Sequence, residues 1–442
     1  MRCICPAVLL SLAMLLFAKP VFGADAGSEW ERLNQDFEKL WEAAEFDRAV
    51  VVAKKALQIA EKNVGADHPD LATSMGNLAL VYHSQGRYGL AEPLYKRALK
   101  IEENVFGPHH PNVAGTLNNI GELYRARDEY SKAEPLYTRA LQILEKSFGP
   151  TSFDVTPTLG YLAELYREKG EYSKAKPLYE RALAIIEKTL GPEHLLAAKP
   201  LNNFAELYRE KGEYSKAEPL YKRALAISER ELGSEHPNVA LCLNCMAQLY
   251  YAQQRHDAAE QLCKRALEIS EKALGANHPN VAGILNTLAL IYRATRRYAD
   301  AEQLYRRALD IYVNTHGSQH LSIAITLTNL GAVCRAQRKY ADAETHYKRA
   351  LEISEKTVGP NHPSVGTSLN NLADLYCAQN QQAKAEPLYQ RSLIIFEKAF
   401  GREHPNVAGV LENVARLYRT TVRVSEADRL EQRAADIRAI KR

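Results

Sequence analysis

Two cysteines separated by two residues, Cys242 and Cys245, come closest in this sequence to a catalytic motif. Such a pair can exchange thiol and disulfide when it opens a helix beside a strand. Here the pair lies inside a segment with helical periodicity, and Cys263 stands where other repeats carry tyrosine. We therefore interpret these cysteines as core residues. Thiol redox enzymology at Cys242 and Cys245, or an oxidised Cys245–Cys263 pair, is a remote alternative.

Polar side chains that suit peptide binding recur at intervals of 42 residues. Asparagine amides can donate to and accept from an extended peptide backbone, and arginine can grip a carboxylate with two bonds. The predicted binding residues are Asn118, Asn119, Glu122, Arg125, Glu164, Arg167, Asn202, Asn203, Glu206, Arg209, Asn244, Asn286, Arg293 and Asn370. Two structural alternatives stay open: one asparagine row ties neighbouring helices together, and the Glu–Arg pairs are solvated bridges within one helix.

Other recurring polar residues favour structural roles. An arginine row from Arg97 to Arg433 is expected to pair with acids on its own helix. Eight histidines in phase belong to successive repeats, too far apart to converge on one ion, so they are expected at helix starts. Outside the repeat pattern there is no Ser/His/Asp set, phosphate-binding loop or dinucleotide fingerprint. We expect no catalytic residues, no metal and no cofactor.

The repeat itself is marked by glycines at 65, 107, 149, 191, 233, 275, 317, 359 and 401. Within one unit, residues 117–124 and 133–143 each carry apolar side chains at helical spacing, which predicts two helices. Ser131 is expected to cap the second helix, with Pro135 in its first turn. The period glycine is expected to end that helix in the left-handed conformation, and Pro111 to open the first helix.

The chain is therefore predicted to be all-α, a right-handed superhelical solenoid of about ten helix-turn-helix units. A two-helix unit cannot bury its apolar stripe alone, so neighbouring units must stack. The predicted organisation is a signal peptide (1–23), an atypical N-terminal capping helix pair (24–63), tandem 42-residue repeats (64–424) and a C-terminal capping helix (425–442).

These units resemble the tetratricopeptide repeat, whose signature of Leu, Gly/Ala, Tyr, Ala, Tyr/Phe and Ala is matched by Ile120, Gly121, Tyr124, Ala133, Tyr137 and Ala140. The 42-residue period and the Gly-Pro-x-His-Pro loop look most like the kinesin light chain subclass. The sequence departs from the usual 34-residue form by a longer second helix and loop. The resemblance implies a protein-interaction scaffold with a concave groove lined by first helices.

Charge and the first 23 residues set the expected surroundings. The formal net charge is +4, from 57 basic and 53 acidic residues, and nothing favours nucleic acid as a partner. Arg2 followed by an apolar stretch at 7–18 is typical of a secretory signal peptide, so the protein is expected to be secreted or periplasmic. No other stretch reaches the roughly 18 apolar residues of a membrane span. The leading prediction is a non-enzymatic scaffold for a protein or peptide partner. The alternative is self-assembly into an envelope complex, as a homo-oligomer.

Overall fold

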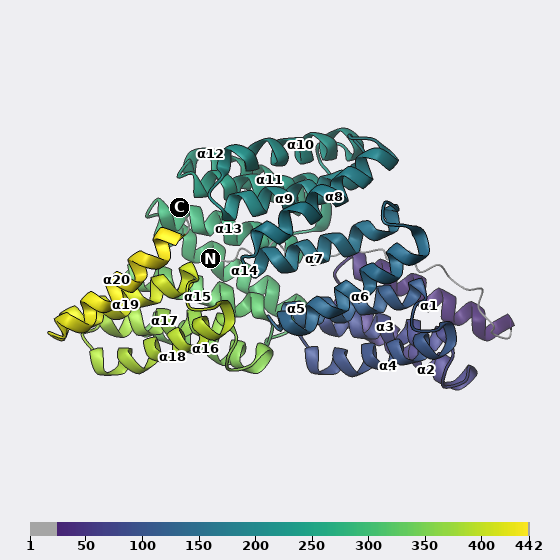
Figure 1. Cartoon of the computed structure of the whole chain (residues 1–442), viewed down its shortest axis with the longest axis horizontal. Coiled ribbons are helices and arrows are strands. Elements are labelled where there is room, and N and C mark those ends of the chain that lie inside the picture. The colour runs from purple at the N-terminus through teal and green to yellow at the C-terminus, as the bar shows by residue number, and fades with distance from the viewer. Residues whose placement is uncertain (1–23, 441–442) are drawn as a thin grey trace. The chain divides into compact units, whose positions relative to one another are not determined.

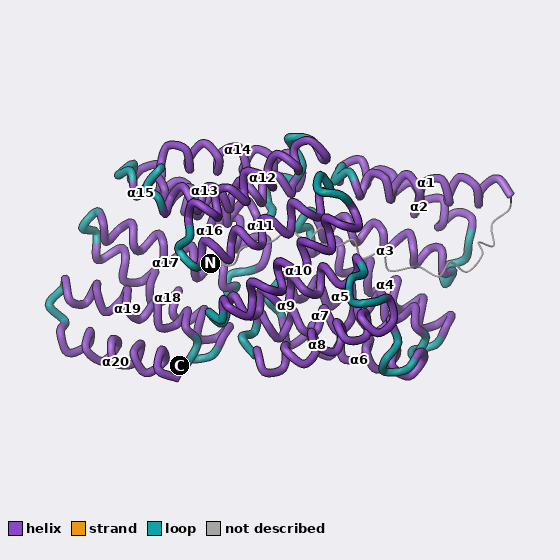
Figure 2. Tube along the Cα trace, turned by 90° about the horizontal axis from the view of Figure 1, so that it is seen from above, coloured by secondary structure: helices purple, strands orange, loops and turns teal. Residues whose placement is uncertain are grey.

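Helices in consecutive pairs make up residues 24–440, the part of the chain that the computed structural model describes (Figure 1). The predicted signal peptide, residues 1–23, lies outside this part. Helices and loops account for every described residue, without a strand among them (Figure 2). The fold is the expected all-α helical solenoid. The right-handed sense of the superhelix remains a prediction.

Each pair consists of a first and a second helix, and the described residues contain twenty α-helices. The first helices are α1 (Ala24–Glu42), α3 (Pro69–Ser84), α5 (Pro111–Ala126), α7 (Thr156–Glu168), α9 (Ala198–Glu210), α11 (Pro237–Ala252), α13 (Pro279–Ala294), α15 (Leu321–Ala336), α17 (Pro363–Ala378) and α19 (Pro405–Thr420). The second helices are α2 (Phe46–Asn63), α4 (Tyr88–Phe106), α6 (Tyr130–Phe148), α8 (Tyr172–Leu190), α10 (Tyr214–Leu232), α12 (His256–Leu274), α14 (Tyr298–His316), α16 (Tyr340–Val358), α18 (Gln382–Phe400) and α20 (Val424–Ile440).

The in-phase histidines start the first helices, as predicted. The Nδ1 atom of His110 accepts a hydrogen bond from the backbone N–H of Asn112, and Pro111 occupies the first helical position. His236 and His404 cap α11 and α19 in the same way. The ring nitrogen thus satisfies one of the backbone donors that a helix start leaves open.

Two first helices begin differently because of proline. Short 3-10 helices, η1 (Phe153–Val155) and η2 (Leu195–Ala197), precede α7 and α9. Pro157 and Pro200 have no N–H to give to the carbonyl four residues earlier, so a longer α-helix would lack one hydrogen bond of its first turn there. Each of these α-helices is therefore only 13 residues long.

The second helices begin earlier than predicted, and the cap assigned to Ser131 was wrong. Helix α6 starts at Tyr130 after Glu129, whose side chain makes no capping bond, and Pro135 lies inside the helix. Asp128 takes a positive φ of 53° and turns the chain into the second helix. The start at Tyr130 buries that ring to 7% exposure, which outweighs a serine cap.

The period glycines from Gly107 to Gly401 have a positive φ, but not the left-handed helical conformation that was expected, and Gly65 does not have a positive φ. Gly107 has φ 87° and ψ 156°, and Gly149 has φ 92° and ψ 154°. This extended, positive-φ region is open essentially only to glycine. Glycine therefore recurs there because the backbone conformation of this turn is strained for any residue that has a side chain.

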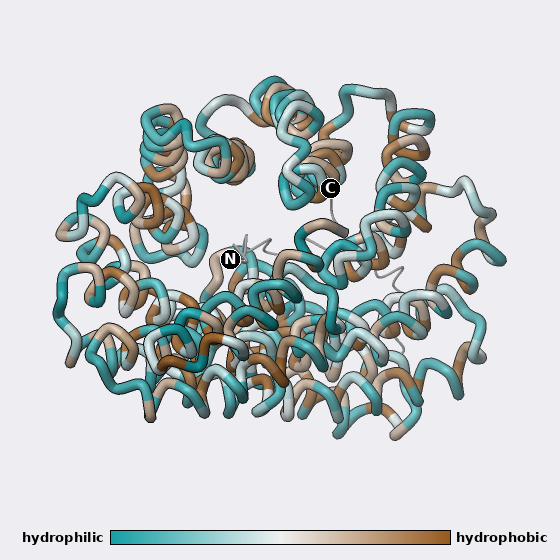
Figure 3. Tube along the Cα trace, turned by 60° about the vertical axis from the view of Figure 1, so that its left-hand side comes forward, coloured by the Kyte–Doolittle hydropathy of each residue, from teal (hydrophilic) through white to brown (hydrophobic). Residues whose placement is uncertain are grey.

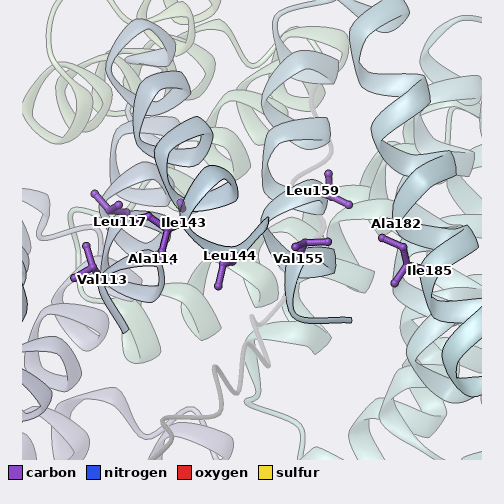
Figure 4. Packing of buried hydrophobic residues seen from close by; sticks show 10 residues of the cluster. Val113, Ala114, Leu117, Ile143, Leu144, Val155, Leu159, Ala182 and Ile185 are labelled. Atoms are coloured by element: carbon purple, nitrogen blue, oxygen red, sulfur yellow. The ribbon is translucent and has the colours of Figure 1, made fainter. Parts of the chain in front are cut away.

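Close packing within a pair depends on a small residue facing a tyrosine. A Cβ atom at Gly121 would lie 2.5 Å from Tyr137 Cε1, so this glycine lets the ring press against α5. Apolar stretches alternate with hydrophilic ones along the helices (Figure 3). Successive pairs share a buried cluster that includes Leu117, Ile143 and Leu159, from α5, α6 and α7 (Figure 4).

Polar bonds also join successive pairs. The Tyr124 hydroxyl in α5 donates to Glu92 of α4 over 2.9 Å, and Arg127 contacts the same carboxylate at 2.9 Å. Tyr166 and Lys169 repeat this arrangement on Glu134, one unit later. The pairs that begin with α5 and α7 are thus held to the preceding pairs by apolar contact and by a shared carboxylate.

The contacts divide the chain into two compact units. One comprises residues up to 291 with 314–317, and the other comprises 292–313 and 318 onward.

Candidate binding face of the first helices

The predicted binding residues all lie on first helices. They are Asn118, Asn119, Glu122 and Arg125 on α5, Glu164 and Arg167 on α7, Asn202, Asn203, Glu206 and Arg209 on α9, Asn244 on α11, Asn286 and Arg293 on α13, and Asn370 on α17. Every one of these side chains is buried or half-buried. Their positions alone do not test whether they bind a partner, and that role stays a prediction.

The charged residues of α5, α7 and α9 form paired ions that cross between helices. Arg125 grips Glu122 through Nε and Nη2, each at 2.8 Å, and its Nη1 donates to Glu168 of the next first helix at 2.6 Å. Arg167 bonds Glu164 at 2.9 Å and Glu210 at 2.5 Å. These arginines therefore link successive first helices.

Burial distinguishes these pairs from the solvated bridges that the sequence left as an alternative. Glu122 is only 4% exposed, and the Arg167 side chain is 11% exposed. Removing one partner from such a pair would leave a charge that water cannot reach freely. The pairs are thus partly buried and already bonded, which limits what these arginines can offer to a ligand, although Arg167 Nε has no partner among the described residues.

Tyrosines of the second helices complete each pair, and the sequence analysis missed them. The hydroxyls of Tyr137 and Tyr179 donate to Glu122 and Glu164, and Tyr221 donates to Glu206 at 2.7 Å. Acid and tyrosine stand 15 residues apart, so no single-helix pattern connects them. Their joint recurrence in the repeat was the only available signal.

Electrostatics follow from this geometry. Burial works to raise the pKa of Glu206, but hydrogen bonds and charge from Arg209 outweigh it and lower the pKa to about 2. The same opposition, between burial and Arg125, leaves the pKa of Glu122 below its usual value. Both carboxylates are therefore ionised at neutral pH.

Asn118, Asn202, Asn244, Asn286 and Asn370 form the first asparagine row, and two of them bond to neighbouring repeats. Asn118 Nδ2 donates to Thr158 Oγ1 of α7 at 2.8 Å, and Asn202 Nδ2 donates to the Cys242 sulfur of α11 at 3.2 Å. The Oδ1 atoms of Asn118, Asn202 and Asn244 are buried and accept no hydrogen bond from any described residue. A buried acceptor without a donor costs free energy, so these oxygens are unusual features of the row.

A second asparagine row consists of Asn77, Asn119, Asn203, Asn329, Asn371 and Asn413. The hydrogen bonds of its side chains differ between the middle and the ends of the array. Asn77 donates to Asn34 at 2.9 Å, and Asn413 donates to Asn370 at 3.0 Å. Asn119 and Asn203 are half-buried and make no side-chain hydrogen bond to another described residue. The amides of Asn119 on α5 and Asn203 on α9 are therefore available to a ligand, unlike those of Asn77 and Asn413 at the two ends.

The arginine row of the second helices has partners other than those predicted. Arg139 bonds Glu103 of the preceding second helix at 2.6 Å and the carbonyl of Pro108 at 2.9 Å. Arg391 bonds Glu355 and the carbonyl of Pro360 in the same manner. The prediction of acids on the same helix was wrong, because stacking brings the preceding acid and loop within reach.

Two of the three cysteines of α11 and α12 lie in the interior, and Cys245 is half-buried. Cys242 is 2% exposed and Cys263 is 0% exposed. A thiol in such surroundings is a poor nucleophile, because burial disfavours the thiolate. This placement agrees with the interpretation as core residues and gives no support to the redox alternative.

Residues 24–440 contain no group of three or more His, Cys, Asp or Glu side chains arranged to hold a metal ion. Of the helices in that range, none combines the length and apolar character that a bilayer crossing requires.

A family model for the tetratricopeptide repeat matches residues 40–104, 77–146, 154–230, 201–244, 239–314 and 322–393, which is most of the chain. The chain belongs to the tetratricopeptide repeat family. Members of this family typically act as scaffolds that bind protein partners. No curated protein sequence matches the chain.

Several solved tetratricopeptide repeat structures are similar to this one. Repeats described as a kinesin light chain, from Podosopora anserina, are 26% identical, cover 46% of this chain and 97% of their own, and have a TM-score of 0.40. BtubC from P. vanneervenii is 26% identical over 52% of this chain and 89% of its own, with a TM-score of 0.42. A Rap protein complexed with competence and sporulation factor is 15% identical over 94% of this chain and 100% of its own, with a TM-score of 0.53. Kinesin light chain-like repeats are thus among the similar structures, as expected, and the Rap protein shares the fold.

Proposed function

We propose that this tetratricopeptide repeat protein is a non-enzymatic scaffold that holds a peptide segment or partner protein along the first helices α5, α7 and α9. The observation that carries the proposal is the pair of half-buried amides of Asn119 and Asn203, which no described residue engages. An amide offers one acceptor and two donor hydrogens, and an extended backbone presents the matching groups. The Rap protein of similar fold is known in complex with competence and sporulation factor, which supports a holding role.

Each polar group has its own part in this proposal. The paired ions Glu122–Arg125 and Glu206–Arg209 fix the surface around the amides, because both residues of each pair are already bonded. Asn244 and Asn286, which belong to the same compact unit, would extend contact beyond α9, and Arg293 and Asn370 belong to the other unit. Recognition then depends on hydrogen bonds to the partner backbone more than on arginine.

The proposed location is the secreted or periplasmic space, on the strength of the signal-like residues 1–23. A partner from that compartment should be recovered with the purified protein as bait and identified by mass spectrometry. Its affinity should then be measured for wild type and for the Asn119→Ala/Asn203→Ala variant by calorimetry.

We expect the double variant to bind at least ten-fold more weakly, since two backbone hydrogen-bonding groups are removed. Asn406→Ala is the matched control, because Asn406 is exposed at the start of α19. Equal affinity of all three proteins would overturn the assignment of the face. A purified protein that recovers only itself, as a defined oligomer, would favour the self-assembly alternative.

A further inference from the structure

The Tyr–Glu–Arg arrangement of α5 and α6 recurs in α15 and α16 with one member missing. Gly331, Arg335 and Tyr347 stand 210 residues after Gly121, Arg125 and Tyr137, which is five periods. The residue equivalent to Glu122 is Ala332. This repeat therefore keeps the tyrosine and the arginine but lacks the carboxylate that they bind elsewhere.

The backbone places the incomplete arrangement in the same geometry as the complete one. A Cβ atom at Gly331 would lie 2.7 Å from Tyr347 Cε1, closely matching the 2.5 Å found for Gly121 and Tyr137. The Tyr347 ring thus presses against α15 as the Tyr137 ring presses against α5. Since the Tyr137 hydroxyl bonds Glu122, the equivalent Tyr347 hydroxyl is expected on the side of Ala332.

The hydroxyl of Tyr347 is left without a partner. The residue is 0% exposed, and its oxygen makes no hydrogen bond to any described residue. In four other repeats the equivalent hydroxyl, of Tyr137, Tyr179, Tyr221 or Tyr389, donates to a carboxylate, whereas Tyr95, whose repeat carries Leu80 at the acid position, has no partner among the described residues. A buried hydroxyl without an acceptor is costly, so this position is chemically incomplete.

Arg335 is the cation of the incomplete position. It has one long ion pair, to Asp374 at 3.7 Å, and its side chain is 36% exposed. Arg125, in contrast, lies between two glutamates at 2.8 and 2.6 Å. Arg335 is therefore less fully neutralised than Arg125.

We propose that α15 and α16 form a binding site for one carboxylate of the partner, held by Arg335 and the Tyr347 hydroxyl in the space beside Ala332. The ligand carboxylate takes the part that Glu122 plays in its own repeat. Ala332 is partly exposed, so this position can be reached from solvent. The inference rests on the proposed scaffold function and adds the chemistry of the partner: an Asp or Glu side chain, or the terminal α-carboxylate of a peptide.

The exposed turns nearby add to the attraction. Arg296 and Arg338 are exposed and adopt positive φ angles of 61° and 62°. Glycine holds the equivalent position at Gly170 and Gly212, where this conformation is unstrained. Two arginines in place of glycine increase the positive potential that an anionic partner meets.

Propionate, which has the length of a glutamate side chain, is a direct probe of this site. Its binding to the full-length protein should be measured by equilibrium dialysis at constant ionic strength, with propionamide as the neutral control. We expect one saturable propionate site with a millimolar dissociation constant, and at least ten-fold weaker binding of propionamide. Equal binding of the two probes would overturn the proposal.

Variants assign the site. Ala332→Glu supplies the missing carboxylate and should abolish propionate binding while raising the melting temperature, and Tyr347→Phe should weaken propionate binding several-fold. Unchanged propionate binding in the folded Ala332→Glu variant would contradict the site. N-acetylalanine and the α-amide of N-acetylglutamate then separate an α-carboxylate from a side-chain carboxylate as the preferred ligand. The Asn119→Ala/Asn203→Ala measurement is independent of propionate, so the two proposals can fail separately.

Discussion

The guanidinium of Arg139 in α6 bonds the carboxylate of Glu103 in α4 at 2.6 Å and the carbonyl of Pro108 at 2.9 Å. One side chain thereby joins the second helix of one repeat to the second helix and the loop of the repeat before it. Because a solenoid is stabilised by contacts between nearest neighbours, this bond bears directly on the cohesion of the array.

Arg139→Ala should lower the free energy of unfolding by about 1 kcal/mol, since the pair is partly exposed but also includes a backbone carbonyl. Chemical denaturation followed by circular dichroism measures the loss. Lys132→Ala on the same helix is the control, because Lys132 pairs only with nearby Glu129. A loss of unfolding free energy no larger than that of the control would show that Arg139 does not stabilise the contact between repeats.

Glu122→Ala should destabilise strongly, by about 3 to 5 kcal/mol, because it leaves Arg125 and Tyr137 without their buried acceptor. Arg125→Glu should be at least as damaging, since it places a third carboxylate beside Glu122 and Glu168. Differential scanning calorimetry against Glu180→Ala, a change at an exposed acid, gives the comparison. Equal melting temperatures of the Glu122→Ala and Glu180→Ala variants would show that the buried ion pair does not stabilise the fold.

Two glycines of α5 should respond to alanine in opposite directions. Gly121→Ala forces a Cβ atom against the Tyr137 ring and should cost about 1 to 3 kcal/mol. Gly115→Ala meets nothing within 4 Å and should stabilise the helix by about 0.5 to 1 kcal/mol. Paired urea titrations measure both changes, and a neutral Gly121→Ala would mean that the two helices are not in close contact.

Stability should depend on pH through Glu102. Burial between α4 and α5 raises the pKa of this carboxyl to about 7, while the Thr116 hydroxyl, 3.0 Å away, acts in the opposite direction. The folded protein therefore holds a proton that the unfolded protein releases near the ordinary glutamate pKa of 4.5, so stability falls as pH rises from about 4.5 through 7.

Glu102→Gln should remove this dependence and be more stable than wild type above pH 7, by about 3 kcal/mol relative to its effect below pH 4.5. Melting temperatures at about pH 4 and about pH 8 test the sign. Glu180→Gln is the exposed control. The assignment fails if the difference between Glu102→Gln and wild type is the same at both pH values.

The sequence predicted the helices and their stacking because the 42-residue repeat displays one local pattern many times. Helix starts at His110 and its equivalents were predictable, since histidine and proline stand directly before most of the apolar stripes. The start at Tyr130 was not, because burial of a ring in the hairpin outweighed the local preference for a serine cap.

The sequence predicted which residues lie on the first helices of the candidate site, but not which residues they contact. The partners of Arg139 and Asn118 lie 36 and 40 residues away, in neighbouring repeats, and only the stacked structure brings them together. For the same reason the sequence could not tell that Arg125 is occupied by Glu122 and Glu168 while Asn119 is left available.

Site-specific photo-crosslinking tests the central claim that the first helices bind the partner. A benzophenone amino acid at position 119 of α5 should form a covalent adduct with the partner, and the same group at Gln142, exposed on α6, should not. Adducts that form from position 142 and not from position 119 would contradict the account.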